Sequence, residues 1–327
     1  MGMLINGKWS NEDRIISNGN YRRQTSAFPQ EISDKTINNI IFQPSRYLLI
    51  GSNSCQWSHR TMLFRELKGL RNYLPLHIAH GPRLEGYAIN GGKPWTIPGA
   101  TEEIVHLHQL YSIADPAFTG RSTVPVLWDS YDLKIISNES TQIMKALDKA
   151  GDKVGSITQA DTKNTTREPI ATFYPPDLTE EMSNLDDEIY HGLSNGVYKA
   201  GFAQTQVSYD HAVQQVFQIL DALEDRLTKN RYLMGSTVTA SDWKLFTTLI
   251  RFDLVYYTLH RCSKKRIIDY PNLWGYARDL YAMKGVSSSI DFEAIRMASF
   301  QNDTESNPFN IIPIATEINW DSPHNRG

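Results

Sequence analysis

Cys55 is the residue whose position in this chain best suits chemistry. It heads the run Cys-Gln-Trp-Ser-His-Arg (residues 55–60) and follows the apolar run Tyr-Leu-Leu-Ile-Gly (residues 47–51). The apolar run predicts a buried strand, and a helix is predicted from about Ser58. A thiol at a helix N-terminus faces unpaired N–H groups and the positive end of the helix dipole, which favour the thiolate. This position therefore indicates a nucleophilic or redox-active thiol.

Position alone does not establish a nucleophile. A lone cysteine is more often a small buried apolar residue. Cys262, in the basic stretch Arg-Cys-Ser-Lys-Lys-Arg, is expected to be structural or incidental. Bringing a free thiol to about nine-tenths thiolate at neutral pH takes roughly 3.4 kcal/mol, whereas a helix terminus supplies about 0.3–2 kcal/mol. Further stabilisation of the thiolate is therefore needed. The nearby candidates are Ser54, Ser58, His59 and Arg60.

Two other segments carry groups that suit a peptide-like thiol. If the Val124-Pro125 bond is cis, the backbone of Val124 forms a strand edge that can pair with an extended ligand. Glu139 and Ser140 open a predicted helix, where the N–H groups and the Ser140 hydroxyl suit a carboxylate and Glu139 suits an ammonium. A γ-glutamyl tripeptide thiol requires these features together with a reactive thiol. The residues alone fit glutathione or another small thiol.

These residues fall within one predicted α/β unit. Strands are predicted at 47–51, 74–80, 124–129 and 134–137, and helices after Ser58, from about Thr101 and up to Gly151. The order strand, helix, strand, helix, strand, strand, helix is the topology of thioredoxin. Pro125 enters the third strand.

The rest of the chain predicts a second, all-helical domain. Apolar residues recur at helical spacing over 208–230, Thr239-Ala-Ser-Asp242 resembles a capping box, and Pro271 suits a helix start. The predicted division is an extension without elements of its own (1–45), a thioredoxin-like glutathione-binding domain (46–151), a linker (152–180), an all-helical domain (181–300) and an extended tail (301–327). The fold class is thus α/β plus all-α.

Composition excludes several classes of function. A net charge of −3 and the lack of an apolar run of about 20 residues argue against nucleic-acid and membrane partners. Two cysteines in 327 residues and a start without a secretory pattern predict a reducing, cytoplasmic location. His106 and His108 are predicted to point to different faces of a helix, and no ligand cluster supports a metal. Nucleotide-binding glycine motifs are also absent from the sequence.

Several separated motifs resemble the glutathionyl-hydroquinone reductases, the omega-like Xi class of glutathione transferases. They are CQWSHRT (55–61), ADPAFTGRSTVPVLWD (114–129), NES (138–140), NGVYKAGFAQTQ (195–206), LFTTLIRFDLVYY (245–257) and DYPNLWGYARDLY (269–281). The resemblance implies a thioredoxin-like domain followed by a helical domain, and a homodimer. It also implies removal of glutathione from a glutathionylated hydroquinone through a mixed disulfide on Cys55.

The resemblance assigns further roles by matching position. It implies that Trp95, Val124, Glu139 and Ser140 bind glutathione and that Tyr198 lies in the pocket for the aromatic substrate. The chain departs from the family pattern at Gln56, where proline is usual, and at Ser299-Phe300, where a tyrosine pair is usual. Glutathione thioltransferase or lyase chemistry with another acceptor, and a non-catalytic binding or dimerisation module, are the alternative functions.

Overall fold

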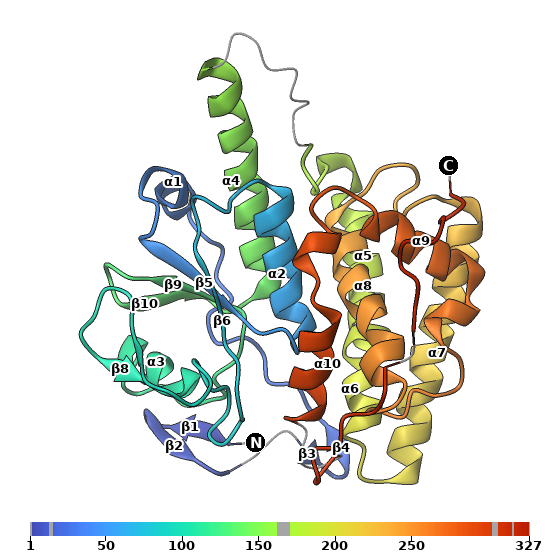
Figure 1. The fold of residues 1–327 in the computed structure, drawn as a ribbon, viewed down its shortest axis with the longest axis horizontal. Coiled ribbons are helices and arrows are strands. Elements are labelled where there is room, and N and C mark those ends of the chain that lie inside the picture. Colours follow the sequence, from blue (N-terminus) through green and yellow to red (C-terminus); the bar gives the residue numbers. More distant parts are fainter. Residues whose placement is uncertain (1, 13–15, 162–170, 303–306, 316, 327) are drawn as a thin grey trace. The chain divides into compact units, whose positions relative to one another are not determined.

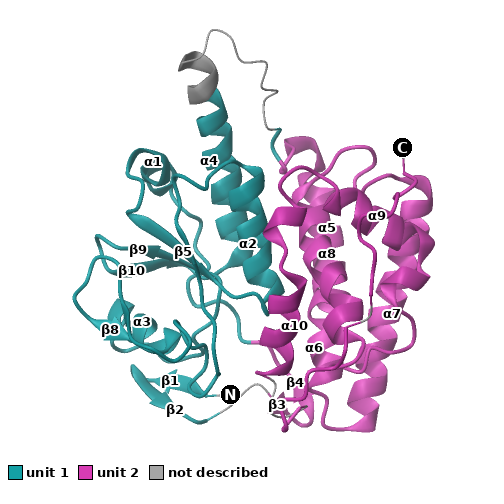
Figure 2. Cartoon of the chain, in the orientation of Figure 1, with its two compact units in different colours: residues 1–13, 24–172 teal, residues 14–23, 173–327 magenta. Residues whose placement is uncertain are grey.

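The computed structural model describes residues 2–12, 16–161, 171–302, 307–315 and 317–326. The chain divides into two compact units, shown in different colours in Figure 2. The first comprises residues 1–13 and 24–172, and the second comprises residues 14–23 and 173–327. The first unit is α/β and the second is helical apart from one short hairpin, which confirms the predicted fold class.

The first unit is built on a mixed sheet with the strand order β10-β9-β5-β6. These strands are β5 (Tyr47–Gly51), β6 (Leu76–Ile78), β9 (Val126–Asp129) and β10 (Lys134–Ser137). β5 runs parallel to β6 and antiparallel to β9, which in turn pairs antiparallel with β10. Every residue of β5 is buried, as expected of a strand that is paired on both sides. The arrangement is the predicted thioredoxin topology.

Helices cover the sheet on both faces (Figure 1). α2 (Gln56–Leu67) and α4 (Ser140–Asp161) lie side by side on one face, and α3 (Leu107–Ala114) lies on the other. Gly151 permits the close approach of α2 and α4, since a Cβ there would lie 2.4 Å from Cβ of Lys68. The buried ammonium of Lys68 pairs with Asp148 at 3.0 Å and with Asp152 at 2.5 Å, which links the same two helices electrostatically.

Two sequence predictions within this unit were wrong. No helix begins at Thr101: residues Glu103–Ile104 form β8, which pairs with β7 (Trp95–Thr96), and α3 starts after the N-cap His106. His106 has extended backbone angles, so the prediction that it and His108 point to different faces of one helix was also wrong. The two rings stack, with 5.7 Å between their centroids. In addition, α4 does not end at Gly151 but continues to Asp161.

The prediction that residues 1–45 lack elements was also wrong. They form two hairpins, β1 (Met3–Ile5) with β2 (Lys8–Ser10) and β3 (Ile16–Ser17) with β4 (Asn20–Tyr21), and the helix α1 (Asp34–Phe42). Both hairpins turn at an Asn-Gly pair, Asn6-Gly7 and Asn18-Gly19, in which all four residues have positive φ. Asn-Gly is the strongest short-range hairpin signal, so the sequence did contain this information.

The second unit is a helical bundle (Figure 1). Its α-helices are α5 (Thr179–Ile189), α6 (Gly196–Gly201), α7 (Gln206–Lys229), α8 (Ala240–Arg251), α9 (Pro271–Tyr281) and α10 (Phe292–Phe300). Shorter segments are the π-helical η2 (Tyr190–Ser194) and η3 (Phe252–Tyr256) and the 3₁₀ segments η1 (Pro176–Leu178), η4 (Ile267–Asp269) and η5 (Ser287–Ser289).

The predictions of a buried central helix and of a helix start at Pro271 are confirmed in this unit. Every residue of α8 is buried, and Pro271 occupies the first position of α9. The 307–320 stretch, predicted to be extended, contains no helix or strand in its described residues. Among the helices of the described chain, none combines the length and apolar character that crossing a bilayer requires.

The predicted capping box of α8 centres on a buried carboxylate. Asp242 Oδ1 accepts from the Leu233 N–H at 2.9 Å and from the Tyr276 hydroxyl at 3.0 Å. Its Oδ2 accepts from the N–H and the hydroxyl of Thr239, at 2.7 and 2.9 Å. Burial raises the pKa of this carboxyl. Four donors from three segments therefore depend on one side chain.

We expect Asp242→Ala to lower the free energy of unfolding by at least about 3 kcal/mol, because it leaves buried donors without an acceptor. Urea unfolding at neutral pH measures the change. Asp210→Ala is the control: Asp210 is exposed on α7 and accepts from Gln206 within the same helix, so its loss should cost no more than about 0.5 kcal/mol. Equal effects of the two substitutions would contradict the role of Asp242.

Candidate functional site

Cys55 lies at the N-terminus of α2, as predicted. It is the N-cap residue, and its Sγ accepts a hydrogen bond from the Ser58 N–H at 3.3 Å. The thiol also lies 3.5 Å from the carbonyl oxygen of Val124, to which it donates. The side chain is 7% exposed. These two contacts hold the sulfur between the first turn of α2 and the backbone of Val124.

Val124, the predicted strand edge, precedes a cis-proline, as that prediction required. The Val124-Pro125 peptide bond is cis, and Pro125 directly precedes β9. The hydroxyl of Tyr111 accepts from the Thr123 N–H at 3.2 Å and donates to the Thr123 carbonyl at 2.8 Å. Both backbone groups of the preceding residue are therefore fixed by one buried phenol, which holds the edge in place.

Glu139 and Ser140 lie at the beginning of α4. The Glu139 N–H donates to Ser137 Oγ at 3.1 Å, and its Oε1 accepts from the Thr141 N–H at 3.1 Å. Its Oε2 accepts from the hydroxyl of Ser26 at 2.6 Å. The carboxylate therefore lies at a helix N-terminus and has donors on both of its oxygens. It is suited to receive a cation.

Asn138 connects this turn to the strand edge. Its Nδ2 donates to the Tyr111 hydroxyl at 3.1 Å and to Thr123 Oγ1 at 3.2 Å. Its Oδ1 accepts from the Phe28 N–H at 2.9 Å. Burial raises the pKa of Tyr111, so the phenol remains protonated and able to donate. One hydrogen-bond network thus fixes the position of the turn that bears Glu139 relative to Val124.

Trp95 lies apart from these residues in the small β7–β8 sheet. Its ring is half-buried and packs against His77, with 4.5 Å between ring centroids. His77 Nε2 is hydrogen-bonded to the Ile89 carbonyl at 2.8 Å, and burial lowers the pKa of the imidazole. The neutral ring therefore supports the indole by packing. The structure gives no direct interaction that assigns Trp95 a ligand.

Tyr198 lies in α6 of the second unit, within an aromatic cluster. Its hydroxyl is 3.3 Å from the hydroxyl of Tyr256. Its ring lies 5.0 Å from His260, 6.2 Å from Phe202 and 6.5 Å from Tyr21, measured between centroids. Tyr256 is buried and Tyr198 is half-buried, so the two hydroxyls form a polar pair within the aromatic cluster.

Tyr256 was not singled out from the sequence, although it lies within the motif at 245–257. It ends the π-helical segment η3, and η2 directly precedes the turn that leads to Tyr198. π-helical turns occur frequently at functional sites, but single-sequence patterns do not reveal them. The tertiary structure was needed to pair these two phenols.

The surroundings of Cys55 add a residue that the sequence did not indicate. Ser54, one of the predicted helpers, accepts from Arg83 Nη2 at 2.6 Å and lies 3.2 Å from the hydroxyl of Ser52. The guanidinium of Arg83 also lies over the Tyr87 ring, 4.0 Å from its centroid. Arg83 therefore fastens the loop before the thiol. Ser58 contributes its backbone N–H to the sulfur, as described above.

The two departures from the family pattern have clear structural positions. Gln56 is the first residue of α2 and is fully buried. Since the N–H at that position has no partner within the helix, proline and glutamine both permit α2 to form. Ser299 and Phe300 end α10, where the Ser299 hydroxyl donates to the Ile295 carbonyl at 2.7 Å and Phe300 is buried. No phenol stands at this position.

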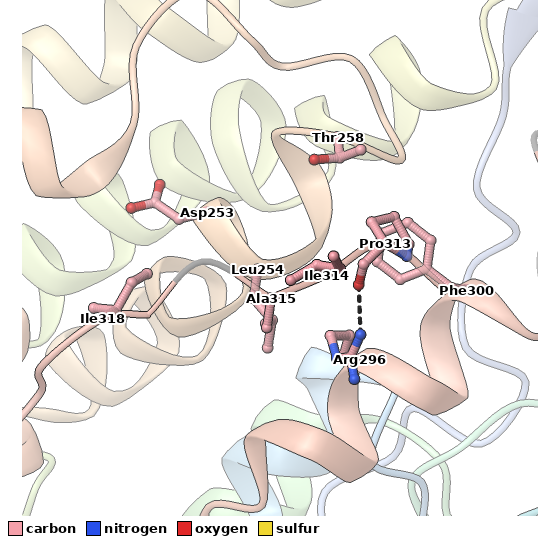
Figure 3. Close-up of a pocket in the computed structure, with 9 residues that line it drawn as sticks. All are labelled: Asp253, Leu254, Thr258, Arg296, Phe300, Pro313, Ile314, Ala315 and Ile318. Carbon is pink, nitrogen blue, oxygen red and sulfur yellow. Dashed lines mark hydrogen bonds between the residues drawn. The ribbon is translucent and has the colours of Figure 1, made fainter. Parts of the chain in front are cut away.

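A pocket of about 30 Å³ in the second unit is a different feature (Figure 3). Arg296 and Phe300 of α10 line it together with Pro313 and Ile314, and Arg296 donates to the Pro313 carbonyl at 2.5 Å. Burial raises the pKa of its Asp253 to about 6. It contains none of the predicted site residues and has room for little more than water. Within the described part of the chain, no group of His, Cys, Asp or Glu side chains could hold a metal ion.

Comparison with known proteins agrees with the motifs. Family models for the glutathione S-transferase N-terminal and C-terminal domains match residues 54–150 and 206–279. The chain is 39% identical to the glutathionyl-hydroquinone reductase YqjG of Escherichia coli strain K12, over 100% of this chain and 98% of that protein. The resemblance inferred from the sequence is confirmed.

Solved structures give the same result. The glutathione-bound structure of YqjG from Escherichia coli K-12 matches with a TM-score of 0.77 and 40% identity, over 86% of this chain and 89% of that one. The Xi class glutathione transferase from Natrialba magadii matches with a TM-score of 0.85 and 33% identity, over 100% of this chain and 97% of that one.

The two cysteines should differ strongly in reactivity. Cys262 is fully buried, and burial raises the pKa of its thiol to about 12, so on the order of one molecule in ten thousand carries its thiolate at pH 8. We expect iodoacetamide to modify Cys55 in the folded protein and to leave Cys262 unmodified, as peptide mass mapping would show. Cys55→Ser and Cys262→Ser variants are the controls. Earlier labelling of Cys262 would contradict this assignment.

Proposed function

This chain belongs to the glutathionyl-hydroquinone reductases, within the glutathione transferase family, and we propose that it removes glutathione from glutathionylated hydroquinones through Cys55. The observation that carries the proposal is the position of the Cys55 sulfur between the N-terminus of α2 and the carbonyl of Val124. A thiol bound at that edge would present its sulfur to Cys55, as disulfide exchange requires.

The first step joins two sulfurs. The Cys55 thiolate attacks the glutathione sulfur of the substrate, so that an S–S bond forms and the bond from sulfur to the ring carbon breaks. The electron pair of the broken bond goes to the ring carbon, which takes a proton, and the hydroquinone leaves. Cys55 is then oxidised to a mixed disulfide with glutathione.

The second step regenerates the thiol. A second glutathione, as its thiolate, attacks the glutathione sulfur of the mixed disulfide, and the Cys55 thiolate leaves. The products of the cycle are the free hydroquinone and oxidised glutathione. Both electrons that reduce the ring carbon come from the two glutathione sulfurs, so no further reductant is needed.

The first unit supplies groups for each part of glutathione. The backbone N–H and C=O of Val124 would pair with the peptide as an added strand would. Glu139 would receive the α-ammonium of the γ-glutamyl residue, while the Ser140 hydroxyl and the first N–H groups of α4 would receive its α-carboxylate. Trp95 would contribute its half-buried indole to glutathione binding.

Tyr198 would act on the leaving hydroquinone. Its hydroxyl is paired with that of Tyr256, which orients it, and a phenol that donates to a hydroquinone oxygen stabilises charge developing on the ring. The second candidate function, thiol transfer to another acceptor, is favoured by the absence of a phenol at Ser299-Phe300. A non-catalytic module would leave the Cys55, Val124 and Glu139 arrangement without a use.

The assembly and location form part of the proposal. We propose a homodimer, as the resemblance implies, and a cytoplasmic location, which the low cysteine content supports. The reaction consumes reduced glutathione, and a reducing compartment supplies it.

Turnover of a glutathionyl-hydroquinone with reduced glutathione tests the nucleophile. Cys55→Ser should lower hydroquinone release by roughly 10³-fold or more, because serine cannot form the disulfide. In the wild-type protein, omission of the second glutathione should leave a glutathione adduct on Cys55, visible by mass spectrometry. Cys262→Ser should turn over normally. Release that persists in Cys55→Ser would contradict the mechanism, and an adduct without hydroquinone release would favour thiol transfer.

Tyr198→Phe tests the phenol while keeping the ring. We expect the kcat for glutathionyl-hydroquinone to fall by roughly 10–100-fold, because a donor to the leaving group is lost, while adduct formation from oxidised glutathione stays unchanged. Tyr209→Phe is the matched control, since the Tyr209 hydroxyl donates to the Arg261 carbonyl at 2.6 Å elsewhere in the helical unit. If Tyr198→Phe lowers hydroquinone turnover and adduct formation from oxidised glutathione equally, the phenol has a structural role only.

A further inference from the structure

A segment of the N-terminal extension is anchored beside the turn that bears Glu139. Residues 24–28 have no regular structure and are held at both ends. At one end, Gln24 Oε1 accepts from the Arg121 N–H at 3.0 Å. At the other, the Phe28 N–H donates to Asn138 at 2.9 Å, and the Phe28 carbonyl accepts from the Ser137 hydroxyl at 2.9 Å.

Side-chain packing reinforces the second anchor. The Phe28 ring lies 6.0 Å from the rings of both Tyr111 and Phe118, measured between centroids. Tyr111 is the phenol that fixes the strand edge before Val124. The segment is therefore attached to the same network that positions the candidate glutathione site.

Ser26 lies between the two anchors, and its hydroxyl donates to Glu139 Oε2 at 2.6 Å. This distance is typical of a hydrogen bond from a hydroxyl to an ionised carboxylate, which is stronger than a neutral one. The other oxygen, Oε1, accepts from the Thr141 N–H at 3.1 Å. Oε1 also accepts from the Ser140 hydroxyl at 3.5 Å, so both oxygens of the carboxylate have donors from the protein, which fix its plane, and Oε2 keeps a lone pair for a ligand.

We propose that Ser26 is a positioning residue that holds Glu139 for the α-ammonium of a γ-glutamyl thiol, an inference that rests on the proposed glutathione-dependent function. A carboxylate with fixed orientation binds an ammonium without first losing rotamer freedom. Ser26 thereby favours thiols that carry an ammonium over those that lack it. The N-terminal extension is then a part of the ligand site and not a covering for the fold.

The test uses two ligands that differ at one group. S-methylglutathione cannot form a disulfide, and its deamino counterpart, with glutaryl in place of γ-glutamyl, lacks the ammonium. In calorimetric titrations, Ser26→Ala should weaken binding of S-methylglutathione by about three- to tenfold, as expected for the loss of one hydrogen bond. Binding of the deamino ligand should change by less than about twofold. Ser26→Thr, which keeps the hydroxyl, should retain the wild-type preference for S-methylglutathione over the deamino ligand.

Two further variants test alternative explanations. Ser33→Ala removes the N-cap hydroxyl of α1, in the same extension but away from Glu139, and should leave the preference unchanged. In a Glu139→Gln background, Ser26→Ala should have no further effect on the preference, because the two residues act as one unit. Phe28→Ala, which loosens the anchor, should reduce the preference as Ser26→Ala does.

Each contrary outcome has a separate meaning. Equal weakening of both ligands by Ser26→Ala would overturn the positioning role and indicate a structural one. No weakening of either ligand would overturn the inference and leave the proposed function standing. Failure of the wild-type protein to bind S-methylglutathione would overturn the proposed function, and the inference with it.

Discussion

The double pairing of β5 is the constraint on which the first unit depends. This strand is hydrogen-bonded to β6 on one side and to β9 on the other, and all five of its residues are buried. Its carboxyl end is therefore fixed, and the residues that follow it lead directly to the N-cap of α2. Because β9 pairs antiparallel with β5, the start of β9 lies beside the same end, and Val124 is two residues before that start. The contact between the Cys55 sulfur and the Val124 carbonyl follows from the sheet order.

Buried polar groups then convert this arrangement into a site with defined geometry. Asn138 and Tyr111 satisfy each other and bridge two loops that are separate in sequence, so the turn with Glu139 and the edge at Val124 cannot shift independently. A buried network of this kind is stable when every member is paired. The N-terminal segment completes it through Phe28 and Ser26. Recognition of glutathione in this chain would then involve residues from both ends of the first unit.

The helical unit follows a different principle. Its central helix α8 is buried along its whole length, and a carboxylate at its start collects donors from three segments. The π-helical segment η3 ends at Tyr256, η2 lies just before the helix that bears Tyr198, and the two phenol oxygens are 3.3 Å apart. Such turns shift side chains out of the ordinary helical register, which explains why spacing along the sequence did not reveal this pair.

The sequence by itself determined the elements whose signals are local. The apolar run at 47–51, the capping box at Thr239 and Pro271 each specify their structure through neighbouring residues, and the position of Cys55 at a helix N-terminus follows from two adjacent elements. The Asn-Gly pairs at 6–7 and 18–19 are equally local signals, each of which specifies a hairpin. The false helix start at Thr101 shows the limit, because β7 and β8 pair through contacts that the local pattern of Thr101-Glu102-Glu103 does not contain.

The tertiary structure alone decided which distant groups meet. Ser26 and Glu139 are 113 positions apart and Tyr198 and Tyr256 are 58 apart, so these contacts depend on the completed packing of each unit and not on any pattern that the chain carries locally.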